Sequence, residues 1–327
     1  MINRRSGSAP ASLWGILLID KPTGLTSHDV VVKVRRVLGV RKVGHTGTLD
    51  PLATGLLVLC VGGVTRFAGY LTSQDKTYRA RIKFGVATAT DDGEGKVVFR
   101  FAGDLKKLVS EKRLRQVIRD LSGSTTQVPP AYSSKKVGGV PAYRLARRGE
   151  KTELAPVPVR IDPVRVLQMD LPEVEVELSC SAGTYLRSFA RDLGSRLGCG
   201  GHLSSLVRTA CGDFRLKDAC SLEELSTTGR QEIKKKYLLP VETALSWMPA
   251  VFLGASDLEK IYHGGAVDRV DGGFALEAGQ KLSQGAHEVR LHAEEGSFIG
   301  IGVLEVRGGN DLCLHPKRLM LEAFPFK

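Results

Sequence analysis

The sequence lacks the segments that place a protein in or across a membrane. No apolar run approaches the roughly 20 residues that a membrane-spanning helix needs, and residues 1–8 lack the apolar core of a signal peptide. Cysteine is sparse as well: six thiols are scattered over 327 residues without a Cys-x-x-Cys pair, so no disulfide framework is expected. We therefore expect a cytoplasmic protein with reduced thiols and no membrane partner.

The common cofactor and metal-binding patterns are missing too. The chain contains neither the G-x-x-x-x-G-K-[ST] phosphate loop nor the G-x-G-x-x-G dinucleotide pattern, and no His-Glu-x-x-His pair or carboxylate cluster. Cys199 lies close to His202 and could suggest a nucleophile pair, but such local patterns transfer poorly between families. We expect neither a cofactor nor a metal ion.

Acidic residues are fewer than basic ones. The chain has 35 Asp and Glu against 47 Lys and Arg, which gives a net charge of +12 and a pI near 9.5. This charge favours a polyanionic partner, and without a membrane segment that partner is best read as nucleic acid. Hydrophobic residues make up 42% of the chain, which is enough for a full core, and the length suggests roughly two domains.

One carboxylate, Asp50, lies in a glycine-rich loop between residues 42 and 56. Gly44, Gly47 and Gly55 are expected to adopt backbone conformations closed to other residues, and Pro51 restricts Asp50 to an extended conformation. The apolar run that follows, residues 56–61, predicts a buried strand. The loop therefore presents a single acid. It could be a structural turn whose aspartate caps backbone N–H groups, or a metal site with His45.

The periodicity predicts an α+β protein. Residues 15–20 and 76–84 are predicted to form strands. Ser27 is expected to cap a helix that ends at Gly39. Residues 174–180 alternate like a strand and lead through a Ser-Ala-Gly turn into another helix. Without a regular βαβ rhythm, we predict a mixed, mainly antiparallel central sheet flanked by helices.

Several separated motifs together resemble the pseudouridine synthases of the bacterial tRNA pseudouridine-55 (TruB) family. The motifs follow the family's order and cover most of residues 13 to 245; they are Gly15–His28, Lys42–Leu56, Lys76–Arg79, Ser181–Arg187 and Leu197–His202. The resemblance implies an enzyme that flips uridine 55 out of the tRNA T loop and isomerises it to pseudouridine without a cofactor. It also implies a possible secondary activity in tRNA folding.

The resemblance assigns roles to six residues. Asp50 is the essential carboxylate, Arg187 pairs with it, and Tyr78 stacks on the uracil and could take part in proton removal from C5. The substrate-binding residues are His45, Tyr78, Tyr185 and Leu206. By spacing alone, Tyr78 is a core aromatic, and Arg187 is a cation near a helix start, where the helix dipole disfavours it. Lys21 has no assigned role.

A basic segment at about residues 124–152 carries six Lys and Arg residues against one acid after position 126, with Tyr132 and Tyr143 between them. Such a charge run is commonly a solvated loop, but cations and rings together also suit RNA. The resemblance implies an insertion that clamps the tRNA T stem-loop, and we expect it to order on binding.

The chain divides into three expected parts: a disordered tail at 1–12, a catalytic domain at 13–247, and a terminal domain at 248–327 that resembles a PUA-type RNA-binding domain. Ser256 and Glu259 form a capping-box pattern for a short helix that Gly264 can end. Short alternating runs then predict a small C-terminal β-barrel.

Three alternative functions remain open. A dyskerin-type synthase would take its target from a guide RNA, a tRNA-folding chaperone would depend on binding alone, and a glycosylase would release free uracil. The length and the basic insertion favour a stand-alone synthase. We expect a monomer that uses no guide RNA.

Overall fold

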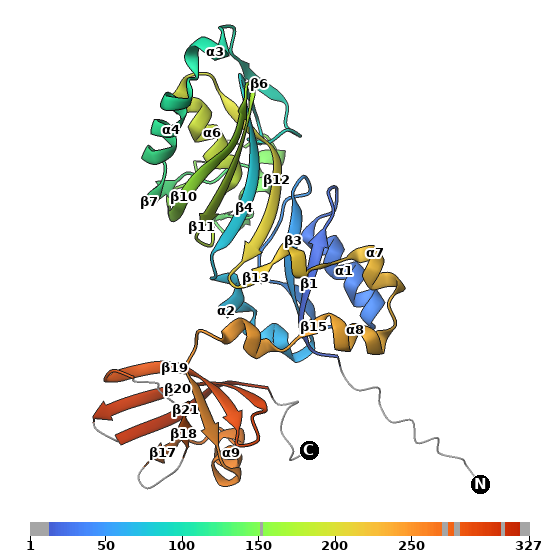
Figure 1. The fold of residues 1–327 in the computed structure, drawn as a ribbon, viewed down its shortest axis with the longest axis vertical. Helices are drawn as coiled ribbons and strands as arrows, with labels where there is room; N and C mark the ends of the chain where they lie inside the picture. The colour runs from blue at the N-terminus through green and yellow to red at the C-terminus, as the bar shows by residue number, and fades with distance from the viewer. Residues whose placement is uncertain (1–12, 151–152, 270–273, 278–281, 309–310, 321–327) are drawn as a thin grey trace, which may run out of the picture.

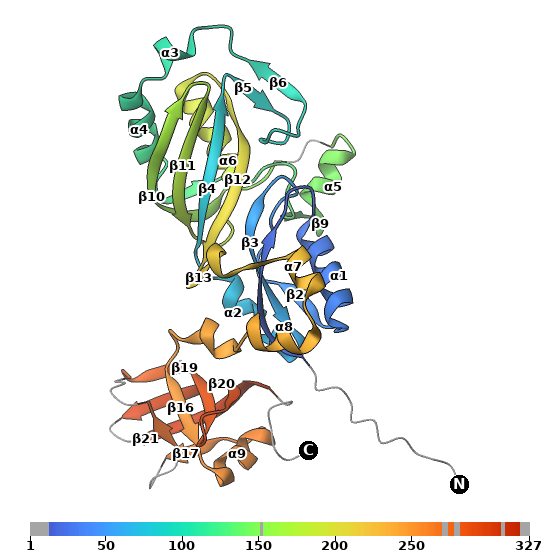
Figure 2. The same cartoon turned by 45° about the vertical axis from the view of Figure 1, so that its right-hand side comes forward.

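The structure is a computed structural model that describes residues 13–150, 153–269, 274–277, 282–308 and 311–320. The tail predicted at 1–12 and the last two residues of the predicted insertion lie outside these ranges. A long mixed sheet forms the body of the molecule, and a second sheet lies at one end of it (Figure 1). Turning the molecule brings the insertion forward, beside the middle of the long sheet (Figure 2).

The long sheet contains eleven strands among the described residues, in the main order β14-β1-β3-β12-β4-β11-β10-β7. Only β1–β14 and β3–β12 pair in parallel in this sheet; its other described pairs are antiparallel. The fold-class prediction is therefore confirmed. The strands are β1 (Gly15–Lys21), β2 (Val43–His45), β3 (Thr54–Val61), β4 (Lys76–Phe84), β7 (Gly123–Gln127), β10 (Val157–Asp170), β11 (Glu173–Cys180), β12 (Gly201–Cys211), β13 (Phe214–Arg215), β14 (Cys220–Ser221) and β15 (Leu238–Leu239).

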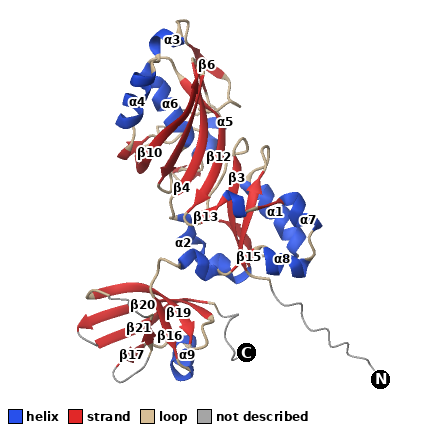
Figure 3. Cartoon of the chain, viewed as in Figure 1, coloured by secondary structure: helices blue, strands red, loops and turns tan. Residues whose placement is uncertain are grey.

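Helices flank both ends of this sheet (Figure 3). One group packs beside β1 and β2, and another covers β4, β10 and β12. The first group is α1 (Ser27–Leu38), α7 (Leu222–Thr227) and α8 (Arg230–Lys236); the second is α4 (Glu111–Asp120) and α6 (Leu186–Leu197), preceded by the short α3 (Leu105–Leu108). The remaining short helices of the body are η1 (Gly62–Phe67), α2 (Ala68–Thr72), η2 (Leu216–Asp218) and η3 (Val241–Leu245).

The strand patterns follow from which faces are covered. In β4, Tyr78, Ala80, Ile82 and Phe84 are buried, while Arg79 and Arg81 on the other face are exposed, as the alternation predicts. Strand β3 is apolar almost throughout because both of its faces are covered. Two hydrophobic clusters therefore lie on opposite sides of β1 and β3.

Helix α1 starts one residue earlier than the prediction. Thr26, rather than Ser27, is the N-cap, and its hydroxyl accepts from the Asp29 N–H while the Asp29 carboxylate accepts from the Thr26 N–H. Gly39 ends the helix in the left-handed conformation with φ +62°, as expected. Ser27 is free of the capping role and faces the core, where it contacts the loop that carries Asp50.

The insertion at about residues 124–152, which we expect to order on RNA binding, contains regular structure within its described residues. A small hairpin of β8 (Lys136–Val137) and β9 (Val140–Pro141) leads into helix α5 (Ala142–Arg147). The rings and cations of this segment contact one another, since the Arg147 guanidinium lies 5.6 Å from the centre of the Tyr143 ring. A second hairpin, β5 (Val86–Thr88) with β6 (Val97–Arg100), follows β4.

The C-terminal sheet has six strands in the order β17-β21-β20-β19-β16-β18 and forms an open, curled sheet (Figure 2). Its strands are β16 (Ala250–Leu253), β17 (Val267–Arg269), β18 (Ala275–Leu276), β19 (Gly285–Ala293), β20 (Phe298–Gly308) and β21 (Asp311–Leu319). Helix α9 (Ala255–Tyr262) has Gly254 as its N-cap, without a side-chain capping hydrogen bond, so the predicted capping box at Ser256 is wrong. Gly264 follows the helix end with φ +83°.

The C-terminal sheet packs against the body through apolar side chains. Phe298, Ile301 and Met320 share a buried cluster with residues of η1 and β1, and the Phe298 ring meets the Phe67 ring edge-on at 5.6 Å. Polar contacts border this cluster: the Arg318 guanidinium donates to the Arg66 carbonyl at 2.6 Å.

Candidate active site

The loop that carries Asp50 is held by hydrogen bonds on both sides of the carboxylate. The Leu49 N–H donates to the Ser27 hydroxyl at 2.8 Å, and the Gly24 N–H donates to the Pro51 carbonyl at 2.8 Å. The Leu49 side chain is 3% exposed and belongs to the main core. Helix α1 and the turn before it therefore fix the backbone of Asp50.

Only one of the three loop glycines needs the conformation that we expected of all three. Gly55 has φ +94°, and a Cβ there would lie 2.4 Å from the Arg208 carbonyl, so no larger residue fits without a backbone shift. Gly44 and Gly47 do not have positive φ angles. Gly44 lies in strand β2, and a Cβ on Gly47 would make ordinary contacts with Arg208 and Lys76.

Asp50 pairs with Arg187. The Arg187 Nε lies 2.9 Å from Asp50 Oδ2, and its Nη2 donates to Oδ1 at 3.3 Å. This is the fork geometry by which a guanidinium fixes the plane of a carboxylate. The Arg187 side chain is 7% exposed and that of Asp50 35% exposed, so the cation is buried while the acid faces open space.

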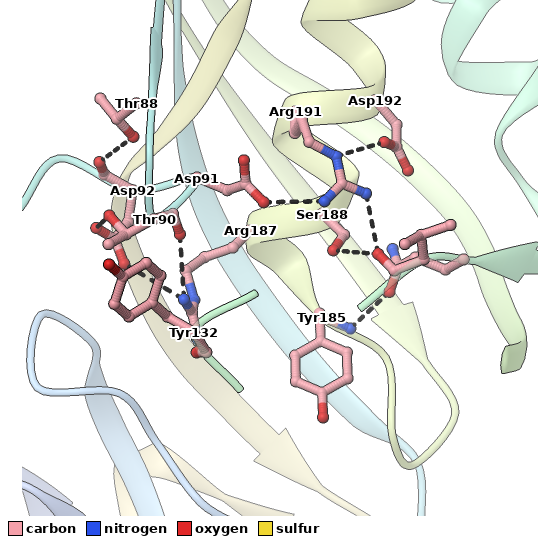
Figure 4. Close-up of polar contacts among 12 residues, drawn as sticks. Thr88, Thr90, Asp91, Asp92, Tyr132, Tyr185, Arg187, Ser188, Arg191 and Asp192 are labelled. Atoms are coloured by element: carbon pink, nitrogen blue, oxygen red, sulfur yellow. Dashed lines mark hydrogen bonds and ion pairs between the residues drawn. The ribbon is translucent and has the colours of Figure 1, made fainter. Parts of the chain in front are cut away.

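Arg187 has three further partners, all of which appear in Figure 4. Its Nη1 donates to the Thr90 carbonyl at 3.1 Å and its Nη2 to the Tyr132 carbonyl at 2.9 Å. The buried Asp92 carboxylate lies 3.7 Å from Nη1. These acceptors explain how a buried cation is accommodated in the first turn of α6. Sequence reasoning missed Asp92, because no motif marks the turn after β5.

A neighbouring network ties α6 to the chain after β7 (Figure 4). Arg191 pairs with Asp91 and Asp192 at 2.9 Å each, and its Nη2 donates to the Val128 carbonyl at 2.9 Å. The Ser188 hydroxyl donates to the same carbonyl at 2.8 Å. The start of the basic insertion is therefore anchored to the helix that carries Arg187.

A cavity of about 600 Å³ opens at the Asp50–Arg187 pair. Five of the six residues assigned from the sequence line it: Asp50, Tyr78, Tyr185, Arg187 and Leu206. The insertion contributes one wall of the cavity through Tyr132, Ser133, Ser134 and Tyr143. The structure thus brings together side chains from β4, α6, β12, the Asp50 loop and the insertion.

His45 is the assigned residue that does not line this cavity. It is the last residue of β2 and is half-buried. Burial lowers the pKa of its imidazole, and the nearby Arg208 charge lowers it further. Its Nδ1 is buried and has no hydrogen-bond partner. His45 therefore belongs to the same loop as Asp50 without lining the cavity, and its contact with the substrate stays a prediction.

Arg208 is a buried cation that sequence reasoning did not identify. It is 2% exposed, and it donates to the Leu56 carbonyl at 2.6 Å and to the Gly47 carbonyl at 3.1 Å. Its register partner on β4 is Tyr78. Burial raises the pKa of the Tyr78 phenol, and Arg208 opposes that shift through its charge and a side-chain hydrogen bond.

Two buried lysines belong to the elements around the cavity. Lys21 is fully buried, and its ammonium donates to the Leu25 carbonyl at 2.7 Å and to the Pro22 carbonyl at 2.9 Å. Lys76 lines the cavity and is 6% exposed. Burial lowers the pKa of both ammonium groups. Lys21 thus stabilises the turn at Pro22 through hydrogen bonds. The sequence had left the role of Lys21 unassigned.

The cysteines do not form a nucleophile site. All six are free and buried. Cys199 and His202 have separate partners, because the Cys199 thiol contacts the Gly194 carbonyl at 3.9 Å and the His202 Nδ1 lies 2.8 Å from the Val86 carbonyl. The part of the chain that the structure describes holds no group of three or more His, Cys, Asp and Glu side chains able to bind a metal ion. Within the same ranges, every helix is too short or too polar to cross a membrane.

Comparison with protein families gives two matches. Residues 35–186 match the model of the TruB family pseudouridylate synthase (N terminal domain), and residues 187–246 match the tRNA pseudouridylate synthase B C-terminal domain. The first match contains Asp50, Tyr78 and Tyr185, and the second begins at Arg187. The two matches meet inside helix α6 and together contain the cavity residues from the Asp50 loop onward.

Curated relatives match over nearly the whole chain. The tRNA pseudouridine synthase B of Aquifex aeolicus is 39% identical over 94% of this chain and 99% of that protein, and that of Cupriavidus metallidurans is 38% identical over 94% of each. Among solved structures, a chain from a crystal structure of a Cbf5-Nop10-Gar1 complex aligns with a TM-score of 0.70 at 24% identity, over 97% of this chain and 92% of that chain. That likeness is one of fold.

Proposed function

The chain belongs to the TruB family of pseudouridylate synthases, and we propose that it isomerises the T-loop uridine of tRNA, uridine 55, to pseudouridine. The observation that carries the proposal is the fork between Arg187 and Asp50 at the edge of a cavity lined by Tyr78, Tyr185 and Leu206. The relatives named tRNA pseudouridine synthase B support tRNA as the substrate class.

The reaction needs one acid and no redox change. The N1–C1′ bond breaks, the base turns, C5 bonds to C1′, and the C5 proton leaves while N1 gains one. An ionised Asp50 can attack C1′ or uracil C6, or it can carry the C2′ proton and return it. In each route the Arg187 guanidinium holds the carboxylate plane fixed toward the cavity.

Tyr78 suits the last proton transfer. Its ring lies in the cavity wall and its phenol lies beside Arg208. In the free protein burial favours the neutral phenol, so the phenol must first release its own proton to solvent before its oxygen can accept the C5 proton. Arg208 favours the phenolate that acts as this base, and the phenolate becomes neutral again when it takes the C5 proton. Tyr185 and Leu206 line the same cavity from two other elements of the wall, which supports a role for both in contacting the base together with Tyr78.

The target base has to leave the folded T loop to reach Asp50. Flipping costs a few kcal/mol, which contacts between the protein and the rest of the stem-loop can offset. We assign this binding to the insertion at residues 124–152 and to a terminal RNA-binding domain of PUA type at 248–327, with the catalytic domain at 13–247. The net charge of +12 supports the attraction to RNA. We further propose a cytoplasmic monomer that needs no guide RNA.

The first test is direct. The purified chain is incubated in chelator, without guide RNA, with an unmodified tRNA transcript, and pseudouridine is mapped at nucleotide resolution. We expect pseudouridine at the T-loop uridine and no free uracil. Asp50→Asn protein, checked for folding by its melting temperature, should give no product.

Each other outcome identifies a different function. Binding without isomerisation, together with faster tRNA folding by the Asp50→Asn protein, would make this chain a folding chaperone. Activity restored only by guide RNA and partner proteins would indicate a guide-dependent synthase. Release of uracil would indicate a glycosylase. Substantial isomerisation by well-folded Asp50→Asn protein would remove Asp50 from its assigned role.

A further inference from the structure

One residue of the cavity wall carries a buried hydroxyl that has no hydrogen-bond partner. Four side-chain atoms in the described ranges are buried and unpartnered: Ser133 Oγ, His45 Nδ1, Gln74 Oε1 and His292 Nε2. Of these four residues, only Ser133 lines the cavity at Asp50. Ser133 is 4% exposed. An unpaired buried hydroxyl is costly, so a partner is expected at some stage of the reaction.

The backbone around Ser133 is already fixed. Its carbonyl accepts from the Tyr143 N–H at 3.0 Å. The preceding carbonyl, that of Tyr132, accepts from Arg187 Nη2 at 2.9 Å. The residue before Ser133 in the chain therefore contacts Arg187, which pairs with Asp50. These two hydrogen bonds hold the backbone at Ser133, and neither involves the Ser133 hydroxyl.

We propose that Ser133 is a substrate-binding residue whose hydroxyl hydrogen-bonds to the flipped uracil base. This inference rests on the proposed function. The edge of uracil carries two carbonyl acceptors and one N–H donor, and a serine hydroxyl can donate to the former or accept from the latter. Tyr78, Tyr185 and Leu206 offer contacts to the faces of the base, so its polar edge is the part that still needs a partner.

The burial of Ser133 favours a contact with the base over a contact with the RNA backbone. A phosphate brought to a residue that is 4% exposed would lose most of its hydration, which is far more costly than burying an uncharged base edge. The neighbouring Ser134 is exposed and lines the same cavity. It is positioned nearer the solvent and serves as the matched control.

The test compares Ser133→Ala with Ser134→Ala. Because alanine removes a group that has no partner in the free protein, we expect Ser133→Ala to melt at the wild-type temperature or above it. Its kcat/KM for tRNA should fall about tenfold, the effect of one lost hydrogen bond to the substrate. Ser134→Ala should leave the melting temperature unchanged and should lower kcat/KM less than Ser133→Ala does, because its exposed hydroxyl can be hydrated in the free protein. Ser133→Cys, a weaker hydrogen-bonding side chain of similar shape, should give an intermediate kcat/KM.

A second comparison locates the contact on the base. In an Asp50→Asn background, which prevents turnover, affinity is measured for tRNA with uridine at the target position and for tRNA that is abasic there. We expect the Ser133→Ala change to weaken binding of the uridine-containing tRNA and to leave the abasic tRNA unaffected. Equal losses for both RNAs would overturn the proposal in favour of a backbone contact.

Two other results would also overturn it. Equal affinity of the parent and the Ser133→Ala protein for uridine-containing tRNA would show that the hydroxyl has no substrate contact. A lowered melting temperature would show that it has a structural partner instead. These failures are distinct from failure of the proposed function, which would appear as absence of pseudouridine with the wild-type protein.

Discussion

The Arg187 guanidinium has two carboxylate neighbours, and only one of them faces the cavity. Asp50 takes the Nε–Nη2 fork and Asp92 lies at Nη1, where its side chain is 7% exposed. Nη1 already donates to the Thr90 carbonyl at 3.1 Å, and Asp92 adds a negative charge 3.7 Å from the same nitrogen. Asp92 therefore keeps the fork aligned with Asp50 without touching the substrate itself, which is the function of a positioning residue.

Asp92→Asn should lower activity more than stability. The amide oxygen can still accept from the Glu94 N–H, which bonds Asp92 at 3.1 Å, but the charge that aligns Arg187 is lost. We expect kcat to fall at least about tenfold, equivalent to about 1.4 kcal/mol, with KM little changed. Asp91→Asn is the matched control, because Asp91 pairs with Arg191 instead and asparagine tolerates its φ of +61°. Equal effects of the two variants would contradict the assignment.

Buried thiols make stability sensitive to alkali. Burial raises the pKa of Cys60 to about 12 from 9.0. Below the ordinary pKa both folded and unfolded thiols are neutral; above it, the unfolded thiol ionises while the folded one keeps its proton, so stability falls with rising pH. At about pH 10.5 the loss from Cys60 alone is about 2 kcal/mol. Urea unfolding at about pH 8 and pH 10.5 should show a smaller loss for Cys60→Ala than for wild type. An identical loss of stability in Cys60→Ala and in wild type would contradict this explanation.

The sequence could identify Asp50, Arg187, Tyr78, Tyr185 and Leu206 because each lies inside or beside a local motif. Asp92, Arg208 and Ser133 could not be found in that way. Their roles depend on which groups the fold brings close. Arg208 meets Tyr78 through strand register, and Ser133 lines the cavity with a buried hydroxyl that has no partner. Such pairings join positions far apart in the chain, and no local spacing records them.

Among the elements, strands with one covered face were the easiest to predict. The alternation in β4 and β11 follows directly from their burial, and their predicted limits agree closely with the structure. Helix starts were harder. Thr26 and Ser27 are both good capping residues, and the deciding signal was Asp29, which stands three residues after Thr26 and completes its capping box. At Ser256 the same pattern gave a wrong prediction, because Gly254 is the N-cap of the helix.

The two residues at the start of α1 should respond differently to alanine. Thr26→Ala removes a cap and should cost about 1 kcal/mol of stability. Ser27→Ala removes the acceptor of the buried Leu49 N–H and should cost about 1–3 kcal/mol. Because Leu49 precedes Asp50, Ser27→Ala should also lower kcat, whereas Thr26→Ala should affect kcat less. Urea unfolding and single-turnover kinetics on both proteins test this. A catalytic loss confined to Thr26→Ala would contradict the role given to Ser27.

At the scale of the whole molecule, β1 and β3 connect two cores. One of their faces belongs to the cluster that contains α1 residues, and the other belongs to the cluster that contains residues of η1, η3 and the C-terminal sheet. The apolar sequences of these strands indicated burial on both faces, but they could not indicate that part of the covering layer comes from residues 298–320 of the same chain. Which segment covers these strands is decided by contacts between distant parts of the chain, and no single segment of the sequence reveals those contacts.

This shared cluster should make the two parts of the chain unfold together. Phe298 is 4% exposed and packs edge-on against Phe67, so Phe298→Ala should cost about 3–5 kcal/mol and should separate one calorimetric transition into two. Phe274, which is 1% exposed, lies in the core of the C-terminal sheet only. Phe274→Ala should destabilise that sheet to a similar extent while leaving the contact with η1 intact. If Phe298→Ala still unfolds in one transition, or if a chain ending at residue 247 is as stable as the full chain, the interface does not couple the two parts. Coupling would instead mean that tRNA bound to the terminal sheet is held in a fixed position relative to Asp50.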